Sequence, residues 1–384
     1  MITYLDNAAT TFPKPPAVND EVLRCLRSYC GNPGRSAHPL AAASADKIYE
    51  CRERLAAFFG SEHPENIIFT MNTTYALNMA IKGLIRKGDH ILISDMEHNS
   101  VYRPVSRLAS EGIAAYDIFP TVKDGLPLDD EEILSSIKKR IRRGRTRMLI
   151  CSHVPNICSA ERPIKKIGEL CRRCGIIFVV DAAQSAGHLP IDIGDLCIDV
   201  LCAPAHKGLF GIQGCGFMLL GKGTAPLPII EGGSGVNSLE AEMPDMFPER
   251  YEAGTLPTPC IAGLSEGIGF LSKIPSGDIA KKEAALFKRT RELLEDSRLL
   301  NAKIYFPDSA GSVLLFNLDG IPSEDVGRFL GKQGICVRSG FHCSALGHRA
   351  LGTEDDGAVR VSFSIMNTER DVDILIKALR SLRQ

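Results

Sequence analysis

The feature that most constrains the fold of this chain is a regular alternation of short apolar runs with longer helical patterns. Seven short runs have the composition of strands, and most are separated by segments with helical periodicity. The predicted strands are Asn66–Thr70, His90–Ser94, Ala115–Phe119, Arg147–Cys151, Ile176–Asp181, Asp199–Cys202 and Gly216–Leu220. The predicted helices are Thr74–Arg86, Ser100–Ser110, Asp129–Arg142 and Pro163–Cys174. Because strand–helix–strand units build parallel sheets, we expect an α/β fold with a mostly parallel seven-stranded sheet.

The pattern changes after about Thr255, where strands become rarer and helices longer. The elements predicted there are helices at Ile261–Ser272, Ala280–Leu294, Ser323–Gln333 and Thr368–Leu382, and strands at Ser312–Leu318 and Ala358–Phe363. A chain of 384 residues also exceeds the roughly 100–200 residues of a usual domain. We expect a large α/β domain over 16–255, a smaller α+β domain over 256–384, and an N-terminal segment, 1–15, that packs with the smaller domain.

The charge balance argues against a nucleic-acid or membrane-surface protein. Lys and Arg total 45 against 46 for Asp and Glu, so the net charge is −1. The first residues show no basic start followed by an apolar stretch, and no run reaches the length of a membrane helix. The 13 cysteines are odd in number and scattered, which favours free thiols in a reducing cytoplasm over a disulfide framework. We also expect no metal site, because Cys171 and Cys174 lie in a helical pattern without a second pair.

Polar residues follow five of the predicted strands at the point where each strand ends. Ligands of open α/β sheets bind beyond the carboxyl ends of the strands, so these clusters mark a candidate pocket. The clusters are Asn72-Thr73-Thr74, Asp95-Met96-Glu97-His98-Asn99, Ser152-His153-Val154-Pro155-Asn156, Asp181-Ala182-Ala183-Gln184 and Ala203-Pro204-Ala205-His206-Lys207-Gly208. Each cluster alone also has an ordinary explanation: a helix cap, a turn, or a solvated lysine or histidine. Their coincidence at one sheet edge is the stronger argument.

Pyridoxal phosphate explains these clusters together. A lysine amine forms a Schiff base with its aldehyde, and we predict that Lys207 is that lysine. A carboxylate keeps its pyridine nitrogen protonated, the role we predict for Asp181. An aromatic side chain stacks on the ring, and a helix N-terminus with hydroxyl groups binds the phosphate.

The sequence resembles the NifS-like cysteine desulfurases, the class V aminotransferase branch of the fold-type I pyridoxal-phosphate enzymes. The likeness runs nearly end to end. It rests on Leu5-Asp6-Asn7-Ala8-Ala9-Thr10-Thr11, Glu97-His98, Asn156, Asp181-Ala182-Ala183-Gln184, His206-Lys207, Tyr251-Glu252-Ala253-Gly254-Thr255, Arg338-Ser339-Gly340-Phe341-His342-Cys343 and Arg360. The resemblance implies a fold-type I transferase, with a large cofactor-binding domain and a small domain that carries Cys343 and Arg360.

The resemblance also implies a role for each matching residue. Lys207 would hold the cofactor and move the substrate Cα proton, while His98 would stack on the ring and donate protons. Asp181 would contact the pyridine nitrogen, and Gln184 and Asn156 would contact the ring hydroxyl or the substrate. The phosphate would be held by Thr73, Thr74 and His206, together with Thr255 of the partner in a homodimer. Arg360 would bind the substrate carboxylate.

Cys343 decides which reaction is expected within this family. It matches the cysteine that attacks the substrate sulfur, and nearby cations favour a reactive thiolate. The short stretch Ser344-Ala345-Leu346-Gly347-His348 resembles the SufS-like branch, which has a short ordered loop at this place. We therefore expect a cysteine desulfurase that converts L-cysteine to L-alanine and passes a persulfide sulfur to an acceptor protein, for iron–sulfur cluster assembly or other sulfur metabolism.

The sequence departs from the family at Pro204. The family usually has a serine three residues before the lysine, and proline offers neither a hydroxyl nor an N–H group to the phosphate. The phosphate would then depend on Thr73, Thr74, His206 and Thr255.

Other activities stay open at this point. Selenocysteine lyase, cysteine-sulfinate lyase and aminotransferase reactions use the same scaffold with Cys343 idle. A non-catalytic thiol or zinc protein would lack the cofactor altogether. A dinucleotide-dependent dehydrogenase is disfavoured, because no strand is followed by a Gly-x-Gly-x-x-Gly motif and a helix.

Overall fold

The computed structural model describes residues 2–34, 37–296 and 300–382. Its largest sheet has seven strands in the order β2-β10-β9-β8-β7-β3-β4. The strand bounds are β2 Ile67–Thr70, β3 His90–Ser94, β4 Ala115–Phe119, β7 Thr146–Ser152, β8 Ile177–Asp181, β9 Val200–Pro204 and β10 Gly216–Leu220. Neighbouring strands are parallel except at β10, which pairs antiparallel with both β2 and β9. The predicted α/β fold with a mostly parallel seven-stranded sheet is confirmed.

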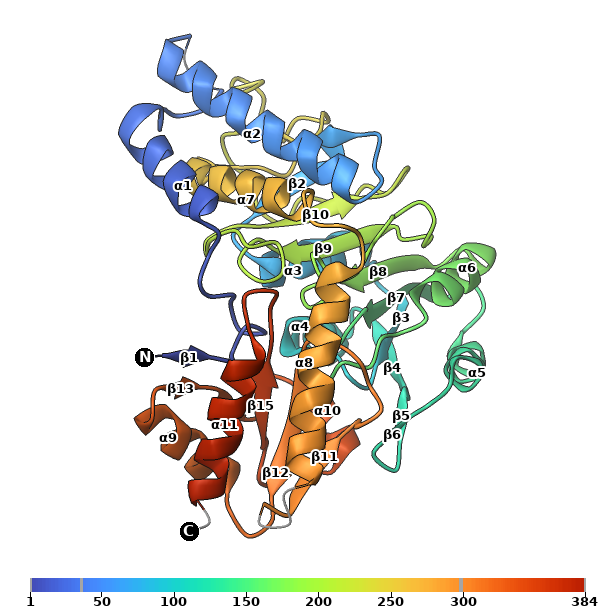
Figure 1. Ribbon diagram of the computed structural model, residues 1–384. Helices are drawn as coiled ribbons and strands as arrows, with labels where there is room; N and C mark the ends of the chain where they lie inside the picture. Colours follow the sequence, from blue (N-terminus) through green and yellow to red (C-terminus); the bar gives the residue numbers. More distant parts are fainter. Residues whose placement is uncertain (1, 35–36, 297–299, 383–384) are drawn as a thin grey trace.

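Helices cover both faces of this sheet, as its strands require (Figure 1). One face packs against α2 Pro39–Phe58, α5 Asp130–Arg140, α6 Ile164–Cys174 and α7 Thr258–Leu271. The other face packs against α3 Thr73–Leu84 and α4 Asn99–Ser110. Successive residues of β9 alternate between the two cores: Leu201 joins the first, and Val200 and Cys202 join the second. Strands buried on both faces lack a polar alternation, which is why these runs are continuously apolar.

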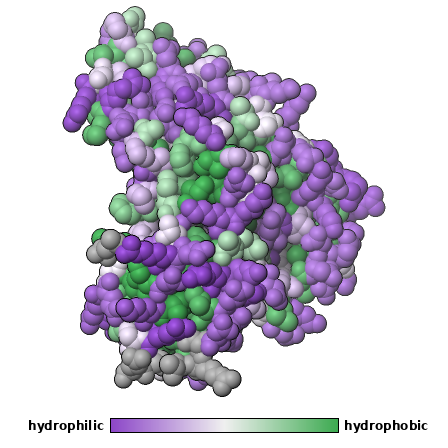
Figure 2. Space-filling view, in the orientation of Figure 1, coloured by the Kyte–Doolittle hydropathy of each residue, from purple (hydrophilic) through white to green (hydrophobic). Residues whose placement is uncertain are grey.

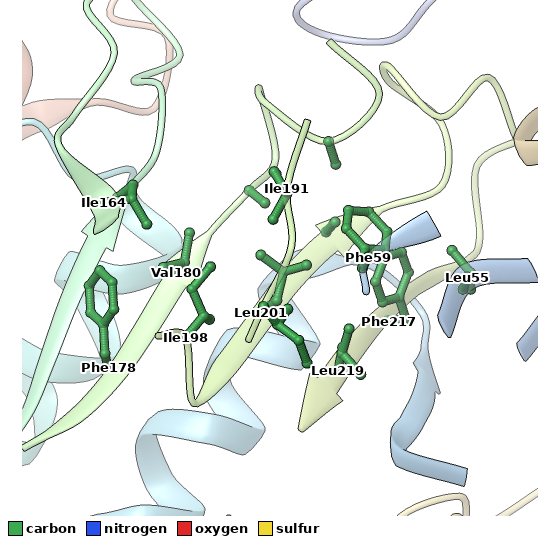
Figure 3. Packing of buried hydrophobic residues seen from close by; sticks show 14 of the residues in the cluster. Leu55, Phe59, Ile164, Phe178, Val180, Ile191, Ile198, Leu201, Phe217 and Leu219 are labelled. Atoms are coloured by element: carbon green, nitrogen blue, oxygen red, sulfur yellow. The ribbon is translucent and has the colours of Figure 1, made fainter. Parts of the chain in front are cut away.

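Aromatic side chains fill the first core near the edge of the sheet. Phe59 of the α2 C-cap and Phe217 of β10 lie with their ring centroids 5.6 Å apart, beside Leu55 and Leu219 (Figure 3). Phe59 and Phe217 are both fully buried. This packing fixes β10, and with it the turn that precedes β10 near the cavity described below.

A second, four-stranded antiparallel sheet is formed by the later part of the chain, in the order β11-β12-β15-β14. Its bounds are β11 Ala302–Tyr305, β12 Val313–Leu318, β14 Arg338–Gly340 and β15 Ala358–Ser362. One face packs against α8 Asp278–Glu295, α9 Ser323–Lys332 and α11 Glu369–Leu382. The short helix α10 Ala345–Leu351 lies between β14 and β15 in the sequence. Figure 1 shows α8 extending from the seven-stranded part of the molecule to this second sheet.

The N-terminal segment joins these two parts. Its strand β1, Thr3–Tyr4, pairs in parallel with β13, Ile335–Cys336. A few residues later, the backbone N–H of Thr11 donates to the carbonyl of His206, which precedes Lys207. Residues 3–14 therefore contact both the second sheet and the loop that carries Lys207.

Several features of the elements differ from the sequence prediction. Helices α1 Pro16–Ser28 and α2, the 3-10 turn Pro64–Asn66, and strands β1, β5 Val122–Lys123, β6 Leu126–Pro127, β11, β13 and β14 were not predicted. Predicted helix ends were also too long, since Thr74–Arg86 ends at Leu84 and Asp129–Arg142 ends at Arg140. The antiparallel placement of β10 follows from the short connection between β9 and β10, which has no crossover helix. No helix within the described residues is long and apolar enough to span a membrane.

Candidate active site

A cavity of about 110 Å³ opens at the carboxyl ends of the parallel strands. It brings together eight residues that the sequence predicted for one site. These are Thr73, Thr74, His98, Asn156, Asp181, Gln184, His206 and Lys207; the other lining residues are Asn72, Ser100, Ser152, Val154, Ala183 and Pro204. A larger cavity of about 600 Å³ lies between the 187–196 segment and the connection from α7 to α8. The smaller cavity is the candidate site, because it alone gathers an amine, a carboxylate and imidazoles.

Lys207 lies in a tight loop that follows β9. The carbonyl of Lys207 accepts from the N–H of Phe210, and Gly211 N–H donates to the carbonyl of Ala205, so the loop is closed on itself. The pKa of the Lys207 amine is lowered to about 8, mainly by burial and also by the guanidinium groups of Arg360 and Arg338, while the charges of Asp181 and Asp6 oppose this shift. The amine is therefore partly neutral near pH 7.5, the form that can act as a nucleophile or a base.

Asp181 is the last residue of β8 and is buried. Its Oδ1 accepts from the backbone N–H of Ala183 at 2.9 Å. Burial raises the pKa of this carboxyl, while the Ala183 N–H and the charge of Lys207 lower it. An acid in this position can pair with a cationic group that enters the cavity.

His98 forms the N-cap of α4. Its Nδ1 accepts from the backbone N–H of Ser100 at 3.0 Å and lies 2.8 Å from the Ser100 hydroxyl. Because Nδ1 is an acceptor, the proton of the neutral ring is on Nε2. Burial lowers the pKa of His98 to about 4, with a smaller contribution from the charge of Lys207. The side chain is thus a neutral donor at physiological pH.

The start of α3 forms an anion cradle at the floor of the cavity. Thr73 is its first residue, and Asn72 caps the helix by accepting from the N–H of Tyr75 at 3.1 Å. Gly216 lies so close that an added Cβ would stand 2.8 Å from the Asn72 carbonyl carbon and 3.0 Å from the Thr73 nitrogen. Thr73 Oγ1 and His206 Nδ1 are both buried and have no hydrogen-bond partner among the described residues. Two unsatisfied polar atoms beside a helix N-terminus suit a phosphate.

Asn156 and Gln184 also line the cavity, but each has already donated one hydrogen bond to the protein. Asn156 Nδ2 donates to the carbonyl of His342 at 2.7 Å, and Gln184 Nε2 donates to the carbonyl of Ala8 at 3.0 Å. Asn156 Oδ1 is buried without a partner in residues 2–34, 37–296 and 300–382. That oxygen is available to accept from a bound molecule.

Arg360 lies behind Asn156 and is 1% exposed. Its Nη1 donates to the carbonyl of Asn156 at 2.9 Å, and its Nη2 donates to Asp6 Oδ1 at 2.9 Å. Its Nε finds no partner in the described part of the chain. The Arg360 guanidinium therefore lies behind the residues that line the cavity, and its Nε–H is free to donate to an anion.

Cys343 is exposed and lies outside the residues that line the cavity. It is nevertheless tied to the site, because its carbonyl accepts from the N–H of Asn99, the residue after His98, at 2.9 Å. Its Sγ accepts from Arg338 Nη2 at 3.7 Å.

Thr255 is exposed and also lies outside the lining of the cavity. Within one described chain, therefore, Thr255 is not part of the candidate site.

Three polar residues at the site were not predicted as site residues. Ser100 and Ser152 line the cavity, and Glu97 lies buried behind it. Glu97 accepts from the Ser152 N–H at 2.8 Å and from the Ser152 hydroxyl at 2.9 Å. Burial raises the pKa of the Glu97 carboxyl to about 7, and the charge of Asp181 adds to this. Glu97 and Ser152 belong to the polar clusters that follow two predicted strands, which was the available sequence signal, whereas Ser100 lies in α4.

Comparison with known proteins identifies the family. Residues 3–375 match the aminotransferase class-V family. The chain belongs to this family.

Among its class-V relatives, a protein named probable cysteine desulfurase from Methanothermobacter thermautotrophicus is 32% identical over 389 residues, covering 99% of this chain and 94% of the relative. The apo structure of cysteine desulfurase from Thermococcus onnurineus NA1 superposes with a TM-score of 0.89 at 30% identity, covering 99% of this chain and 94% of that chain. The cysteine desulfurase CsdA from Escherichia coli gives a TM-score of 0.87 at 25% identity, with coverage of 99% and 94%. These neighbours confirm the predicted resemblance to the NifS-like, fold-type I enzymes. They do not test the more specific assignment to the SufS-like branch.

Class-V enzymes depend on pyridoxal phosphate, and the residues present fit this cofactor. Lys207 offers a partly neutral amine for its aldehyde, and Asp181 offers a buried carboxyl for its pyridine nitrogen. Thr73 and His206 offer unsatisfied buried polar atoms for its phosphate. Pro204, the last residue of β9, also lines the cavity, where its ring contributes no polar hydrogen.

Proposed function

We propose that this class-V chain is a cysteine desulfurase that converts L-cysteine to L-alanine and receives the sulfur on Cys343. The observation that carries the proposal is the convergence of Lys207, Asp181 and His98 on one cavity, with the exposed Cys343 thiol tied to the start of α4. The relatives named as cysteine desulfurases at about 30% identity over nearly the whole chain support the same substrate.

We assign proton transfer to Lys207 and His98. When bound, pyridoxal phosphate supplies an electron sink that acidifies the substrate Cα and weakens its Cβ–S bond. The Lys207 amine, with its pKa of about 8, takes the Cα proton as a base and returns a proton as an acid. His98 carries its proton on Nε2 and acts as the neutral donor near the substrate.

We assign the recognition of substrate and cofactor to the remaining lining residues. Arg360 binds the substrate carboxylate through its free N–H, aided by the unpartnered Oδ1 of Asn156, which accepts from the substrate amine. Thr73, Thr74 and His206 hold the phosphate, Asp181 holds the pyridine nitrogen, and Gln184 holds the ring hydroxyl.

The sulfur step requires Cys343. The Cys343 thiolate attacks the sulfur of the bound cysteine, the Cβ–S bond breaks, and its electron pair goes to the carbon side, where a proton completes the methyl group of alanine. The enzyme keeps the sulfur as a persulfide on Cys343. The exposure of Cys343 then allows transfer of that sulfur to an acceptor protein. In the short stretch 344–348, Ser344 is the N-cap residue of α10 and the other four residues form its first turn, which supports assignment to the short-loop, SufS-like branch.

We further propose a cytoplasmic homodimer. Thr255 is exposed, outside the lining of its own cavity, and free to reach the phosphate in a second subunit. All 13 cysteines are free thiols in the structure, which supports a reducing compartment. We also propose that residues 16–255 and 256–384 act as large and small domains, with 1–15 packed on the small one; the pairing of β1 with β13 supports this division. Light scattering should give twice the 41.7 kDa chain mass.

The test is incubation of the pyridoxal-phosphate form with L-cysteine and dithiothreitol, with alanine and sulfide measured together. Wild type should give the two products in a 1:1 ratio. In Cys343→Ala, the rates of alanine and sulfide formation should both fall at least about 100-fold. Cys336→Ala, a matched change at a half-buried thiol, should keep both rates. Unchanged sulfide release by Cys343→Ala would remove the proposed role of this thiol.

A further inference from the structure

The loop that carries Cys343 has an unusual backbone. His342 and Cys343 have φ angles of +53° and +57°, two consecutive non-glycine residues in the left-handed region. A non-glycine residue in this region is strained and persists only where surrounding contacts hold it. The loop therefore depends on interactions that can be identified by name.

Two of these interactions come from the loops beside the cavity. Asn156 Nδ2 donates to the carbonyl of His342 at 2.7 Å, and the N–H of Asn99 donates to the carbonyl of Cys343 at 2.9 Å. These contacts fix the carbonyls on both sides of the Cys343 Cα. They do not involve the side chain of His342, which points to other partners.

Two buried histidines complete the support. His342 is 2% exposed and His348, in α10, is 1% exposed. The His342 Nδ1 and His348 Nε2 atoms are 3.2 Å apart, and the two ring planes differ by only 12°. At the outer ends, His348 Nδ1 lies 2.7 Å from Thr353 Oγ1, and His342 Nε2 lies 3.4 Å from the carbonyl of Arg338. The four groups form one continuous chain of hydrogen bonds.

The direction of every bond in this chain can be assigned. The Arg338 carbonyl can only accept, so His342 Nε2 donates to it. In a neutral ring, His342 Nδ1 must then accept from His348 Nε2, which leaves His348 Nδ1 as an acceptor. The Thr353 hydroxyl donates to this Nδ1 at 2.7 Å rather than to the more distant His348 carbonyl at 3.3 Å. Burial lowers the pKa of His342 to about 2 and that of His348 to about 4, so both rings are neutral at physiological pH. All the ring nitrogens are therefore satisfied.

We propose that His348 is a positioning residue for sulfur transfer: through His342 it holds the Arg338 backbone against the Cys343 loop and so keeps the Cys343 thiol beside the Arg338 guanidinium. The inference rests on the proposed role of Cys343 as the sulfur-accepting thiol. Arg338 is held at two points, since its carbonyl accepts from His342 and its Nη2 donates to Cys343 Sγ at 3.7 Å. A cationic donor at this distance favours the thiolate that attacks sulfur.

The test measures the thiol directly, apart from turnover. Cys343 in the holoenzyme is alkylated with iodoacetamide at pH 7.5, and the rate is read from the modified peptide by mass spectrometry. We expect His348→Leu to slow alkylation of Cys343 at least threefold and to lower kcat for alanine formation about tenfold, with KM for cysteine unchanged. His348→Gln should recover most of the alkylation rate, because its amide can donate to His342 and accept from Thr353. His63→Leu, at an exposed histidine, should match wild type in both assays.

The outcomes separate the hydrogen-bond chain from simple packing. Wild-type alkylation and kcat in His348→Leu would overturn the proposal, and equal slowing in the Leu and Gln variants would also overturn it, because ring shape alone would then matter. If His348→Leu loses cofactor absorbance or unfolds, Thr353→Val tests the same chain from its other end with the same criteria. Failure of the proposed function shows differently: Cys343→Ala would keep full activity, while alkylation in the His348 variants would still report on positioning.

Discussion

At the scale of single residues, the chemistry of this site depends on how burial sets protonation. The buried Lys207 amine is influenced by two carboxylates, Asp181 and Asp6, and by two guanidinium groups. His98 and His206 are held neutral by burial, each with a pKa of about 4. The cavity therefore contains an amine with a lowered pKa, neutral imidazoles and a carboxyl with a raised pKa.

The pKa of Lys207 predicts how cofactor capture depends on pH. A pKa of about 8 leaves about a quarter of the amine neutral at pH 7.5, against about one part in a thousand for an ordinary lysine. The neutral fraction rises with pH, so the rate of pyridoxal-phosphate capture by apoprotein should rise and level off through pH 8. Asp181→Asn removes a charge that raises this pKa, so its midpoint should move to lower pH. Stopped-flow absorbance measures both rates; a rate that climbs to pH 10 without a midpoint would contradict the assignment.

Individual site residues were predictable where strand ends placed them. Lys207, Asp181 and His98 each follow an apolar strand, and parallel strands bring their carboxyl ends to one edge. The partnership of His342 with His348 was not predictable, because it depends on two left-handed residues that turn the chain between them. The burial of Arg360 behind Asn156 and Asp6 likewise depends on three segments far apart in the sequence.

At the scale of elements, β10 and α3 meet at a contact that only glycine permits. A Cβ at Gly216 would stand within 3.0 Å of backbone atoms of Asn72 and Thr73, which cannot rotate away. The start of α3, the proposed phosphate cradle, is thus positioned by its contact with the first residue of β10.

Gly216→Ala should therefore displace the start of α3 and weaken cofactor binding. We expect roughly tenfold lower affinity for pyridoxal phosphate, measured by fluorescence titration of apoprotein. Gly331→Ala is the matched control, because no atom lies within 4 Å of the added Cβ and α9 continues through this position. Equal affinities in the two variants would show that the close contact has no effect on the cradle.

A buried ion pair joins α2 to the segment after β10. Arg52 Nη2 and Glu252 Oε2 are 2.5 Å apart, with side-chain exposures of 5% and 6%, and Glu252 Oε1 also accepts from the N–H of Phe69 in β2. Arg52→Ala leaves that carboxylate buried without its cation, which should cost about 3–5 kcal/mol of unfolding free energy. Arg107→Ala, which breaks the exposed pair with Glu111, should cost less than about 1 kcal/mol. Urea unfolding of both variants measures the difference.

Elements that alternate along the large sheet were predicted well, and so were the later elements α7, α8, α9, α11, β12 and β15. The missed elements are helices α1, α2 and α10 and the shorter strands. β3, β4 and β10 match their predicted bounds. β3 and β10 are buried on both faces, which favours apolar residues throughout, whereas β4 is a half-buried edge strand. α1 and α2 were not predicted; they pack against α7 from the far end of the large sheet, and α2 is rich in alanine, which leaves little apolar contrast between its faces. β13 and β14 are two and three residues long, which is too short for any periodic signal.

At the scale of the whole molecule, the N-terminal segment links the two sheets (Figure 1). Asn7 Nδ2 donates to the carbonyl of Ser362 in β15 at 2.9 Å, and Lys14 Nζ donates to the carbonyl of His206 at 2.7 Å. Thr11 Oγ1 donates to the carbonyl of Lys207 at 3.0 Å. Figure 2 shows a largely hydrophilic face with hydrophobic residues gathered toward the middle of the molecule.

Loss of hydrogen bonds at one end of the N-terminal segment should also lower the local stability at its other end. In Thr11→Val/Lys14→Met, which lacks two of the side-chain donors to the Lys207 loop and keeps the Thr10 hydroxyl, we expect faster amide hydrogen exchange over 206–210 and also over the β1–β13 pair. Hydrogen–deuterium exchange with mass spectrometry measures both regions, with Arg107→Ala as the control. Faster exchange confined to 206–210 would show that the two ends are independent.

The paired histidines also bear on the affinity of this enzyme for stray metal ions. Thiolate and imidazole are ligands that zinc prefers, although no three such side chains within the described residues are arranged to hold a metal ion. Here the Nδ1 lone pair of each ring already accepts a hydrogen bond and both Nε2 atoms carry protons, so neither ring has a site for a metal. Breaking the pair would leave His342 with an open nitrogen near an exposed sulfur, and the variant would become more susceptible to zinc inhibition than the native enzyme.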